Sequence, residues 1–231
     1  MNITKHIPNT ITCLNLFSGC VACIMAFQGD YFNAALFIYL AALFDFLDGM
    51  MARALKAYSD IGKELDSLAD CISFGMAPGV ILFSWLCGIT SEISLFLPYI
   101  AFLIPVFSAL RLAKFNVDTR QTSSFIGLPT PANAIFVASL ISLHDQSCLS
   151  SILSNVWIIT ALILLLSFLL VSELPMFSLK FKNLTWKDNK TCYIFLIISI
   201  ALLAIFQLTA IPLIIILFIL MSLLLHLIKN R

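Results

Sequence analysis

Long apolar runs separated by short polar connections dominate this chain. Eight of these runs are predicted to be membrane-crossing helices, because each is close to the roughly 20 residues that cross ~30 Å of hydrocarbon. Their apolar residues are consecutive rather than alternating, which argues against a transmembrane β-barrel. We therefore predict an all-α, polytopic membrane bundle of about eight transmembrane helices, forming a single integral membrane domain over residues 1–231. The predicted spans cover roughly residues 10–28, 31–55, 66–87, 95–113, 126–144, 152–173, 191–207 and 210–228.

The composition supports a membrane protein and narrows its partners. Hydrophobic residues make up 61% of the chain and charged residues 11%, whereas soluble domains average about half and about a quarter. The net charge of +1 gives no reason to expect a nucleic-acid partner. The apolar N-terminal run lacks a small-residue cleavage site, so we interpret it as a retained first span in contact with membrane lipid.

Lysine and arginine are confined to alternate connections. All 13 of them lie before the first span, at the junctions between spans 2 and 3, 4 and 5, and 6 and 7, or after the eighth span. The other connections, near Asp30, Glu92, Asp145 and Gln207, contain none. Because positive residues favour the cytoplasmic side of short loops, we predict that both termini are cytoplasmic, in a bacterial inner membrane.

Four aspartates stand at the junction between the second and third spans. The stretch DFLDGMMARALKAYSDIGKELDSLAD runs from Asp45 to Asp70. At ~100° per residue, Asp45 and Asp48 project from one helix face, and Asp66 and Asp70 share a face of the next helix. Two helices joined by a short turn can direct both pairs to one point. Ionisable residues at membrane depth are costly, so they indicate a functional site on the cytoplasmic side.

Divalent cations explain why four carboxylates could converge. Without them, the like charges would repel one another and could not all ionise. Oxygen-only ligands suit Mg²⁺ or Mn²⁺, and two such ions form a clamp suited to phosphoryl transfer. The small residues Gly49, Ala52 and Gly62 would leave room for a bulky ligand, and Arg53 and Lys63 could meet its phosphate charge.

Other interpretations of the aspartates remain open at this point. A proton- or cation-coupled transporter could use them as ion carriers. Aspartates also cap helix ends, which fits Asp60 but does not account for four on matched faces. A membrane-embedded scaffold would need no metal and should tolerate their substitution.

The same stretch resembles the CDP-alcohol phosphatidyltransferase family. The family motif reads D-x-x-D-G-x-x-A-R-x8-G-x-x-x-D-x-x-x-D, and every fixed position matches. The matching residues are Asp45, Asp48, Gly49, Ala52, Arg53, Gly62, Asp66 and Asp70. The resemblance implies that the four aspartates hold two metal ions, Mg²⁺ or Mn²⁺, and that Asp70 is the general base. It also implies that the glycine and alanine positions receive the cytidine nucleotide.

Three further features resemble the branch of the family that uses serine, the phosphatidylserine synthases. These are PNTITCLNLFSG near the N-terminus, CISFGMAPG after Asp70, and RLAKFNVD with SFIGLPTPANA after the fourth span. Lys114 stands where arginine is commoner, and Asn133 where a small residue is usual. The resemblance implies transfer of the phosphatidyl group from CDP-diacylglycerol to the hydroxyl of L-serine, giving phosphatidylserine and CMP.

The resemblance also assigns residues to the donor. Its N-terminal segment places the first four of them near the nucleotide, and the aspartate motif supplies the others. The residues expected to bind CDP-diacylglycerol are Pro8, Asn9, Thr12, Asn15, Asp48, Gly49, Ala52, Arg53, Gly62 and Asp66.

The acceptor contacts are expected among cations near the end of the fourth span. Arg111 and Lys114 could meet the serine carboxylate, or they could serve as positive-inside anchors, which is the better interpretation of Arg120. Asn116 is a candidate polar contact. A sister enzyme that uses glycerol-3-phosphate or inositol phosphate would be expected to need a denser cationic pocket.

The predicted catalytic core covers about residues 5–144, and the helices over about 152–228 are additional. Members of the family are often dimeric, so the resemblance also suggests a homodimer.

Overall fold

The computed structural model describes residues 6–90, 95–118, 125–145, 147–177, 185–186 and 189–229. Most residues in these ranges are helical, and the described residues also include one short antiparallel pair of strands. The helices are α1 (His6–Phe27), α2 (Tyr31–Ala54), α3 (Asp60–Asp70), η2 (Cys71–Met76), α4 (Ala77–Ile89), η3 (Leu97–Phe102), α5 (Leu103–Val117), α6 (Thr130–Ser142), α7 (Ser147–Leu153), α8 (Val156–Val171), α9 (Lys190–Phe206), η4 (Gln207–Thr209) and α10 (Ala210–Lys229). The strands are β1 (Phe125–Ile126) and β2 (Pro175–Met176).

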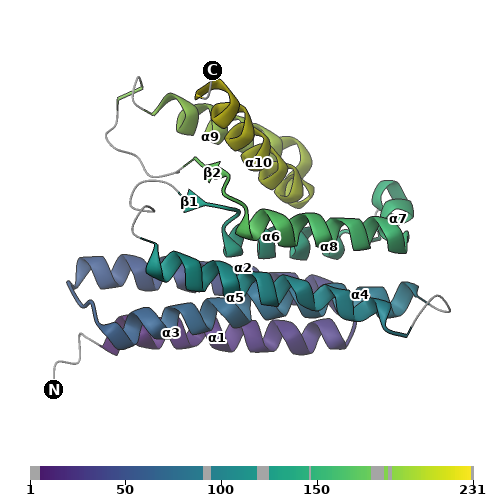
Figure 1. Ribbon diagram of the computed structural model, residues 1–231, viewed down its shortest axis with the longest axis horizontal. Helices are drawn as coiled ribbons and strands as arrows, with labels where there is room; N and C mark the ends of the chain where they lie inside the picture. Colours follow the sequence, from purple (N-terminus) through teal and green to yellow (C-terminus); the bar gives the residue numbers. More distant parts are fainter. Residues whose placement is uncertain are drawn as a thin grey trace.

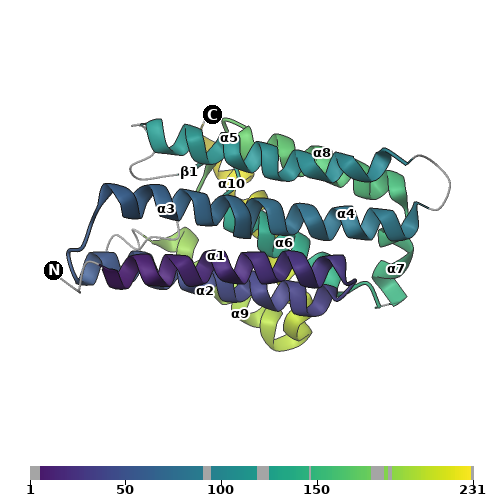
Figure 2. The same cartoon turned by 90° about the horizontal axis from the view of Figure 1, so that it is seen from below.

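The longest helices run side by side along the long axis of the molecule. Figures 1 and 2 show α1, α2, the rod made by α3 and α4, and α5 in this arrangement, with α6 and α8 packed against them. Helices α9 and α10 pack against each other and lie beyond α6, as Figure 1 shows. The all-α polytopic prediction is therefore confirmed.

The number of full-length spans differs from the eight predicted. Among the described residues, five helical segments are long and apolar enough to cross a membrane. The predicted spans 126–144 and 152–173 are shorter helices, α6 and α8, of 13 and 16 residues. At ~1.5 Å per residue, 13 residues cover only ~20 Å. The last two predicted spans form one apolar stretch, which turns at Gln207, where φ is +52°.

The third span also begins earlier than predicted. Helix α3 starts at Asp60 rather than near residue 66, because the Ser59 side chain accepts a hydrogen bond of 3.0 Å from the backbone N–H of Gly62. Such an N-cap satisfies an otherwise unpaired amide of the first turn. Asp60 is exposed in that turn, as expected of a surface residue at a helix end. The motif aspartates therefore lie within a helix rather than at its start.

A π-helical turn, η2, follows Asp70 directly and joins α3 to α4 without a break. Helix α1 approaches this turn closely at Gly19, where an added Cβ would lie 2.7 Å from the Ser73 Cα. In addition, the Ser73 hydroxyl donates to the carbonyl oxygen of Asn15 at 3.0 Å. The first helix is thus fixed against the segment that carries the last motif aspartate.

The start of α6 is set by a short irregular segment. Strands β1 and β2 pair antiparallel, and the Gly127 N–H donates to the Leu174 carbonyl oxygen at 2.9 Å. Gly127 has a φ of +76°, and a Cβ there would lie 2.6 Å from the Leu170 carbonyl oxygen, so glycine is required. Pro129 precedes Thr130 at the start of α6, and Pro131 lies in its first turn. These features delay the helix from the predicted residue 126 to Thr130.

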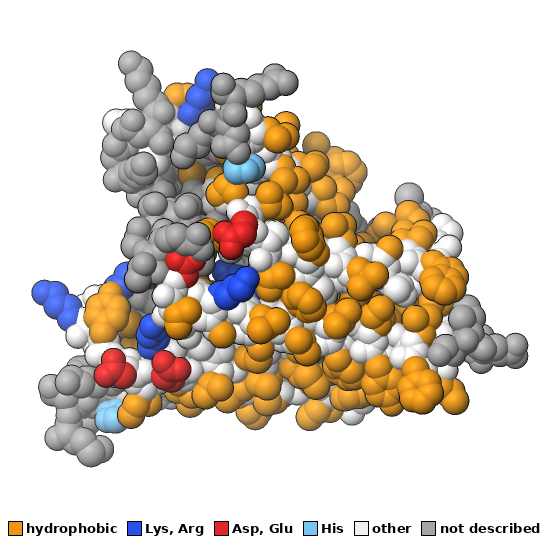
Figure 3. All heavy atoms as spheres, in the orientation of Figure 1, with side chains coloured by type: hydrophobic (Ala, Val, Ile, Leu, Met, Phe, Trp, Pro, Cys, Tyr) orange, Lys and Arg blue, Asp and Glu red, His pale blue; other side chains and the backbone are white. Residues whose placement is uncertain are grey.

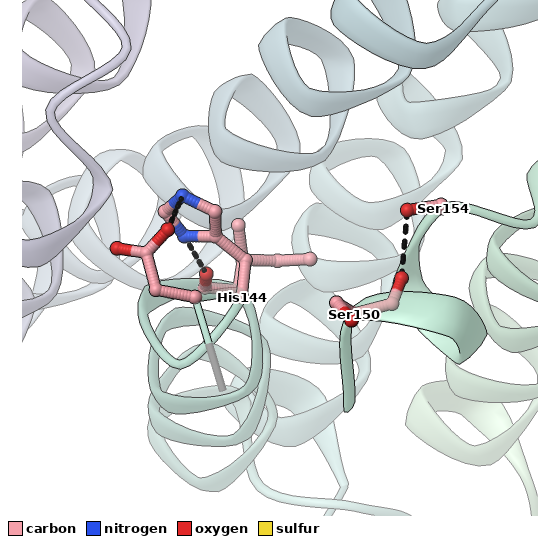
Figure 4. Close-up of polar contacts among 5 residues, drawn as sticks. His144, Ser150 and Ser154 are labelled. Carbon is pink, nitrogen blue, oxygen red and sulfur yellow. Dashed lines mark hydrogen bonds and ion pairs between the residues drawn. The ribbon is translucent and has the colours of Figure 1, made fainter. Parts of the chain in front are cut away.

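The end of the bundle opposite the aspartates is held by aromatic contacts. Tyr31, Trp85 and His144 pack edge to face, with ring centroids 5.0 to 5.7 Å apart. The His144 Nδ1 lies 3.1 Å from the Ile141 carbonyl oxygen (Figure 4), and the Trp85 indole donates to the Leu153 carbonyl oxygen at 2.9 Å. These contacts join α2, α4, α6 and α7 far from the motif residues.

Charged side chains gather at the other end. On the face in Figure 3 they lie at the left, while apolar side chains cover most of the remainder. In Figure 1, the chain start, the α2–α3 connection and the end of α5 share that end. Several residues used in the charge argument lie outside the described ranges: Lys5, Glu92, Arg120, Lys180, Lys182, Lys187 and Arg231.

Candidate active site

Carboxylates from two helices converge at the charged end of the bundle. Asp45 and Asp48 lie in the last turns of α2, and Asp66 lies in α3. One carboxylate oxygen from each lies within 4.8 Å of the others. This arrangement brings together three of the four motif aspartates, two from α2 and one from α3. An all-oxygen donor set of this kind fits a hard divalent cation.

Helix α1 supplies donors to two of the aspartates. The Thr12 hydroxyl donates to Asp48 Oδ2 at 2.6 Å, and the Asn15 Nδ2 donates to Asp70 Oδ1 at 3.3 Å. All four side chains are buried. The orientation of both carboxylates therefore depends on the position of the first helix.

Asp70 is not among the three converging carboxylates. It nevertheless borders the same cavity as Asp45 and Asp66, one turn along α3 from Asp66. Its predicted part as a fourth metal ligand and as general base stays a prediction.

A cavity of about 230 Å³ lies on one side of the aspartates, between α1, α2 and α3; we call it the α1–α3 cavity. Most of the residues predicted for the donor line it. They are Pro8, Asn9, Thr12, Asp48, Gly49, Ala52, Gly62 and Asp66. Two predicted residues do not line it: Asn15 is turned to Asp70, and Arg53 is exposed on α2.

The two motif glycines of this cavity have different surroundings. A Cβ at Gly49 would meet only the Arg53 guanidinium, at 3.8 Å, so this position opens onto free space. A Cβ at Gly62 would lie 2.9 Å from the Ser59 Oγ and 3.0 Å from the Asn9 Oδ1. Gly49 therefore keeps the cavity open, whereas Gly62 lets the Asn9 side chain reach the start of α3.

A second cavity, of about 190 Å³, lies on the other side of the aspartates; we call it the α3–α5 cavity. Its walls combine three carboxylates with a cation and an amide. The residues are Asp45, Asp66, Ser67, Asp70, Arg111, Leu112, Phe115, Asn116, Pro129 and Pro131. Two of the three predicted acceptor contacts, Arg111 and Asn116, are thus brought beside the aspartates.

Arg111 is fixed by contacts on several sides. It is 6% exposed, its guanidinium lies 5.6 Å from the centroid of the Phe115 ring, and Nη1 donates to the Thr130 hydroxyl at 3.3 Å. Its Nε has no hydrogen-bond partner. A buried guanidinium with an unpaired N–H beside carboxylates is suited to an anionic ligand.

Asn116 is held from α3. Its Nδ2 donates to the Ser67 hydroxyl at 2.8 Å, and its backbone carbonyl lies 3.5 Å from the Lys63 Nζ. Lys114, the third predicted acceptor contact, is absent from the α3–α5 cavity and lines another one, described below.

Sequence reasoning missed Phe115, which lines the α3–α5 cavity, and Thr130, which does not line it but accepts a hydrogen bond from Arg111. Phe115 could have been found, because it lies four residues after Arg111 and so on the same helix face. Thr130 stands between two prolines at the start of α6. Its contact with Arg111 carries no local sequence signal, because it depends on how α6 packs beside α5.

Comparison with known proteins agrees with this geometry. A family model described as CDP-alcohol phosphatidyltransferase matches residues 5–169, which continues past residue 144 and through most of α8. Three similar proteins carry the name CDP-diacylglycerol–serine O-phosphatidyltransferase. The Bacillus subtilis protein is 38% identical over 55% of this chain and 70% of its own length. The Mycobacterium leprae protein is 34% identical over 74% of this chain and 57% of its own length. The Methanocaldococcus jannaschii protein is 35% identical over 64% of this chain and 66% of its own length.

These relatives are longer than the region that aligns, since the alignments span 57 to 70% of their lengths. The family model, by contrast, covers well over half of this chain and includes every motif aspartate. The chain therefore belongs to the CDP-alcohol phosphatidyltransferase family.

Proposed function

We propose that this protein transfers the phosphatidyl group of CDP-diacylglycerol to the hydroxyl of L-serine, producing phosphatidylserine and CMP. The observation that supports the proposal is the position of the aspartates in the walls of two cavities, which we assign to the two substrates. The names of the relatives favour serine as the acceptor.

The donor is assigned to the α1–α3 cavity. The open surface at Gly49 and Ala52 accommodates the cytidine nucleotide, and Lys63 lines the same cavity as a cation for its phosphates. The acyl chains remain in the bilayer beside the apolar helices.

Asp45, Asp48 and Asp66 are assigned as metal ligands, with Asp70 as a fourth. Two Mg²⁺ or Mn²⁺ ions held there would neutralise the pyrophosphate and the charge that develops on the leaving CMP. Thr12 orients Asp48 by its hydrogen bond, in the way that outer-shell donors fix metal ligands.

The acceptor is assigned to the α3–α5 cavity. Arg111 meets the serine carboxylate and Asn116 adds a polar contact, while Asp70 takes the proton from the serine hydroxyl. The serine oxygen forms a bond to the phosphorus that bears diacylglycerol, and the bond from that phosphorus to the CMP oxygen breaks. Asn15 holds the Asp70 carboxylate in place, and proximity supplies part of the rate enhancement.

The charge distribution supports an orientation with both termini and the active site in the cytoplasm, in a bacterial inner membrane. A homodimer is proposed by analogy with the family.

One assay tests the reaction. Purified protein is incubated with CDP-diacylglycerol, Mn²⁺ or Mg²⁺, and either L-serine, glycerol-3-phosphate or inositol phosphate, and the lipid product is identified. Phosphatidylserine and stoichiometric CMP are expected only with serine. A product formed only with a phosphate-bearing alcohol would identify a sister enzyme, and ion flux without CMP release would identify a transporter.

The metal assignment has its own test. Chelation with EDTA should stop CMP release and Mn²⁺ should restore it. Asp45→Ala should abolish turnover and remove the stabilisation of the protein by Mn²⁺ in thermal unfolding. Undiminished turnover in the presence of chelator would contradict the assignment.

A further inference from the structure

A third cavity adjoins the active site on the far side of Arg111. It has a volume of about 250 Å³ and lies between the end of α5 and the segment Leu170–Glu173 at the end of α8; we call it the α5–α8 cavity. Arg111 lines both this cavity and the α3–α5 cavity. The two cavities therefore share Arg111 as a wall residue.

The walls of the α5–α8 cavity carry both signs of charge. Arg111 and Lys114 supply cations from α5, and Asp118 and Glu173 supply carboxylates. A small solute that bears both an ammonium and a carboxylate complements these charges of both signs.

Two parts of the chain that are distant in sequence form this cavity. Leu128 N–H donates to the Leu169 carbonyl oxygen at 2.9 Å, and β1 pairs with β2. These contacts hold Ile126 and Ser172, which both line the cavity, at fixed positions beside α5. Backbone pairing therefore fixes the part of the cavity wall that Ile126 and Ser172 form.

Arg111 is placed to serve both spaces. It is buried, its Nη1 is engaged by Thr130, and its Nε is without a partner. A ligand carboxylate arriving from the α5–α8 cavity would meet this guanidinium before it reached the aspartates.

We propose that the α5–α8 cavity is a second, outer binding site for the zwitterionic amino acid acceptor, from which the acceptor passes Arg111 to the aspartates. Lys114 and Arg111 bind the carboxylate there, and Asp118 and Glu173 bind the ammonium. This inference rests on the proposed function and deepens it, since it assigns a role to Lys114 and to the end of α8.

The first test removes one carboxylate. Glu173→Gln should raise the KM for L-serine about three- to tenfold, as expected when a charge-assisted hydrogen bond is replaced by a neutral one. The KM for CDP-diacylglycerol and the turnover number at saturating serine should not change, and Glu173→Asp should restore the serine KM. The matched control is Glu64→Gln, which alters an exposed carboxylate of α3 that lines none of the three cavities.

The second test fills the cavity. Val117 lines it and is 81% exposed, so Val117→Trp adds volume without disturbing the core. This variant should raise the serine KM alone. The control is Val106→Trp, at a half-exposed position of the same helix that lines none of the three cavities.

The outcomes separate this inference from the proposed function. If the wild-type protein makes phosphatidylserine but neither Glu173→Gln nor Val117→Trp changes the serine KM, the outer site is refuted and the proposed function stands. Equal rises in the KM of both substrates, or equal effects in the control variants, would also refute it. If the wild-type protein uses a different alcohol and no serine, both proposals fail.

Discussion

At the scale of single residues, Asp70 has different neighbours from the other motif aspartates. Its carboxylate accepts a hydrogen bond from the side-chain amide of Asn15. The backbone carbonyl of Asn15 in turn accepts a hydrogen bond from the Ser73 hydroxyl. Like Asp45, Asp70 borders the α3–α5 cavity but not the α1–α3 cavity; unlike Asp45, it lies outside the group of three converging carboxylates. A carboxylate fixed beside the proposed acceptor pocket is suited to removing a proton, whereas the other three share a common point.

Asp70→Asn keeps the shape of this side chain but removes its basicity. We expect the turnover number to fall by about 10²–10⁴-fold, while the affinity for CDP changes little. Incorporation of labelled serine into lipid measures the turnover number, and stabilisation by CDP in thermal unfolding measures the affinity for CDP. Asp60→Asn, in the exposed first turn of α3, is the matched control. Full turnover in Asp70→Asn would exclude it as the base.

Thr12 is proposed to act by orienting the Asp48 carboxylate, to which its hydroxyl donates. Thr12→Val removes the hydroxyl that donates to Asp48 Oδ2 and keeps the side-chain volume. The Mn²⁺ concentration for half-maximal activity should rise about 10- to 100-fold, as for other outer-shell partners of metal ligands. Activity at saturating Mn²⁺ should largely recover. An unchanged Mn²⁺ titration would show that this hydrogen bond does not position the ligand.

At the scale of elements, spacing within a helix was predictable and packing between helices was not. The pairs Asp45–Asp48 and Asp66–Asp70 share faces because of helical periodicity, so their approach followed from the sequence. Arg111 and Lys114 are also three residues apart, yet Lys114 lines only the α5–α8 cavity. The other wall of the α5–α8 cavity is the end of α8, a segment without any recognisable motif.

The approach of α1 to η2 is expected to depend on Gly19. In Gly19→Ala the new Cβ would lie 2.7 Å from the Ser73 Cα, and overpacking of this kind costs about 1–3 kcal/mol. Gly88→Ala adds the same methyl in α4 with no atom within 4 Å, so it should be neutral or slightly stabilising. Thermal unfolding in detergent compares the two. Equal stability of both variants would contradict a close contact.

At the scale of the whole molecule, the two ends of the bundle differ in chemistry. One end holds the aspartates, Arg111 and Lys63, and the other is held by the contacts of Tyr31, Trp85 and His144. The alternation of positive connections along the chain was visible in the sequence. The limited length of α6 and α8 was not, because their flanking apolar residues lie in turns and strands.

The proposed orientation can be measured with cysteines introduced at each end. Lys56 and Gln28 are both exposed, in the α2–α3 and α1–α2 connections. In a cysteine-free background, Gln28→Cys should react with a membrane-impermeant maleimide added to intact spheroplasts. Lys56→Cys should react only after the membrane is permeabilised. The opposite pattern would invert the topology and place the active site outside the cytoplasm.

Hydrogen bonds from α1 to carboxylates on α2 and α3 also have a consequence for assembly. The donors of Thr12 and Asn15 are synthesised before their acceptors, so the bond to Asp48 can form only once α2 is present and the bond to Asp70 only once α3 has followed. Because an ion that binds only the folded state stabilises it, Mg²⁺ or Mn²⁺ bound at the proposed metal site would also strengthen the retention of α1 through these donors. Cells starved of these cations should accumulate a protease-sensitive form of the protein.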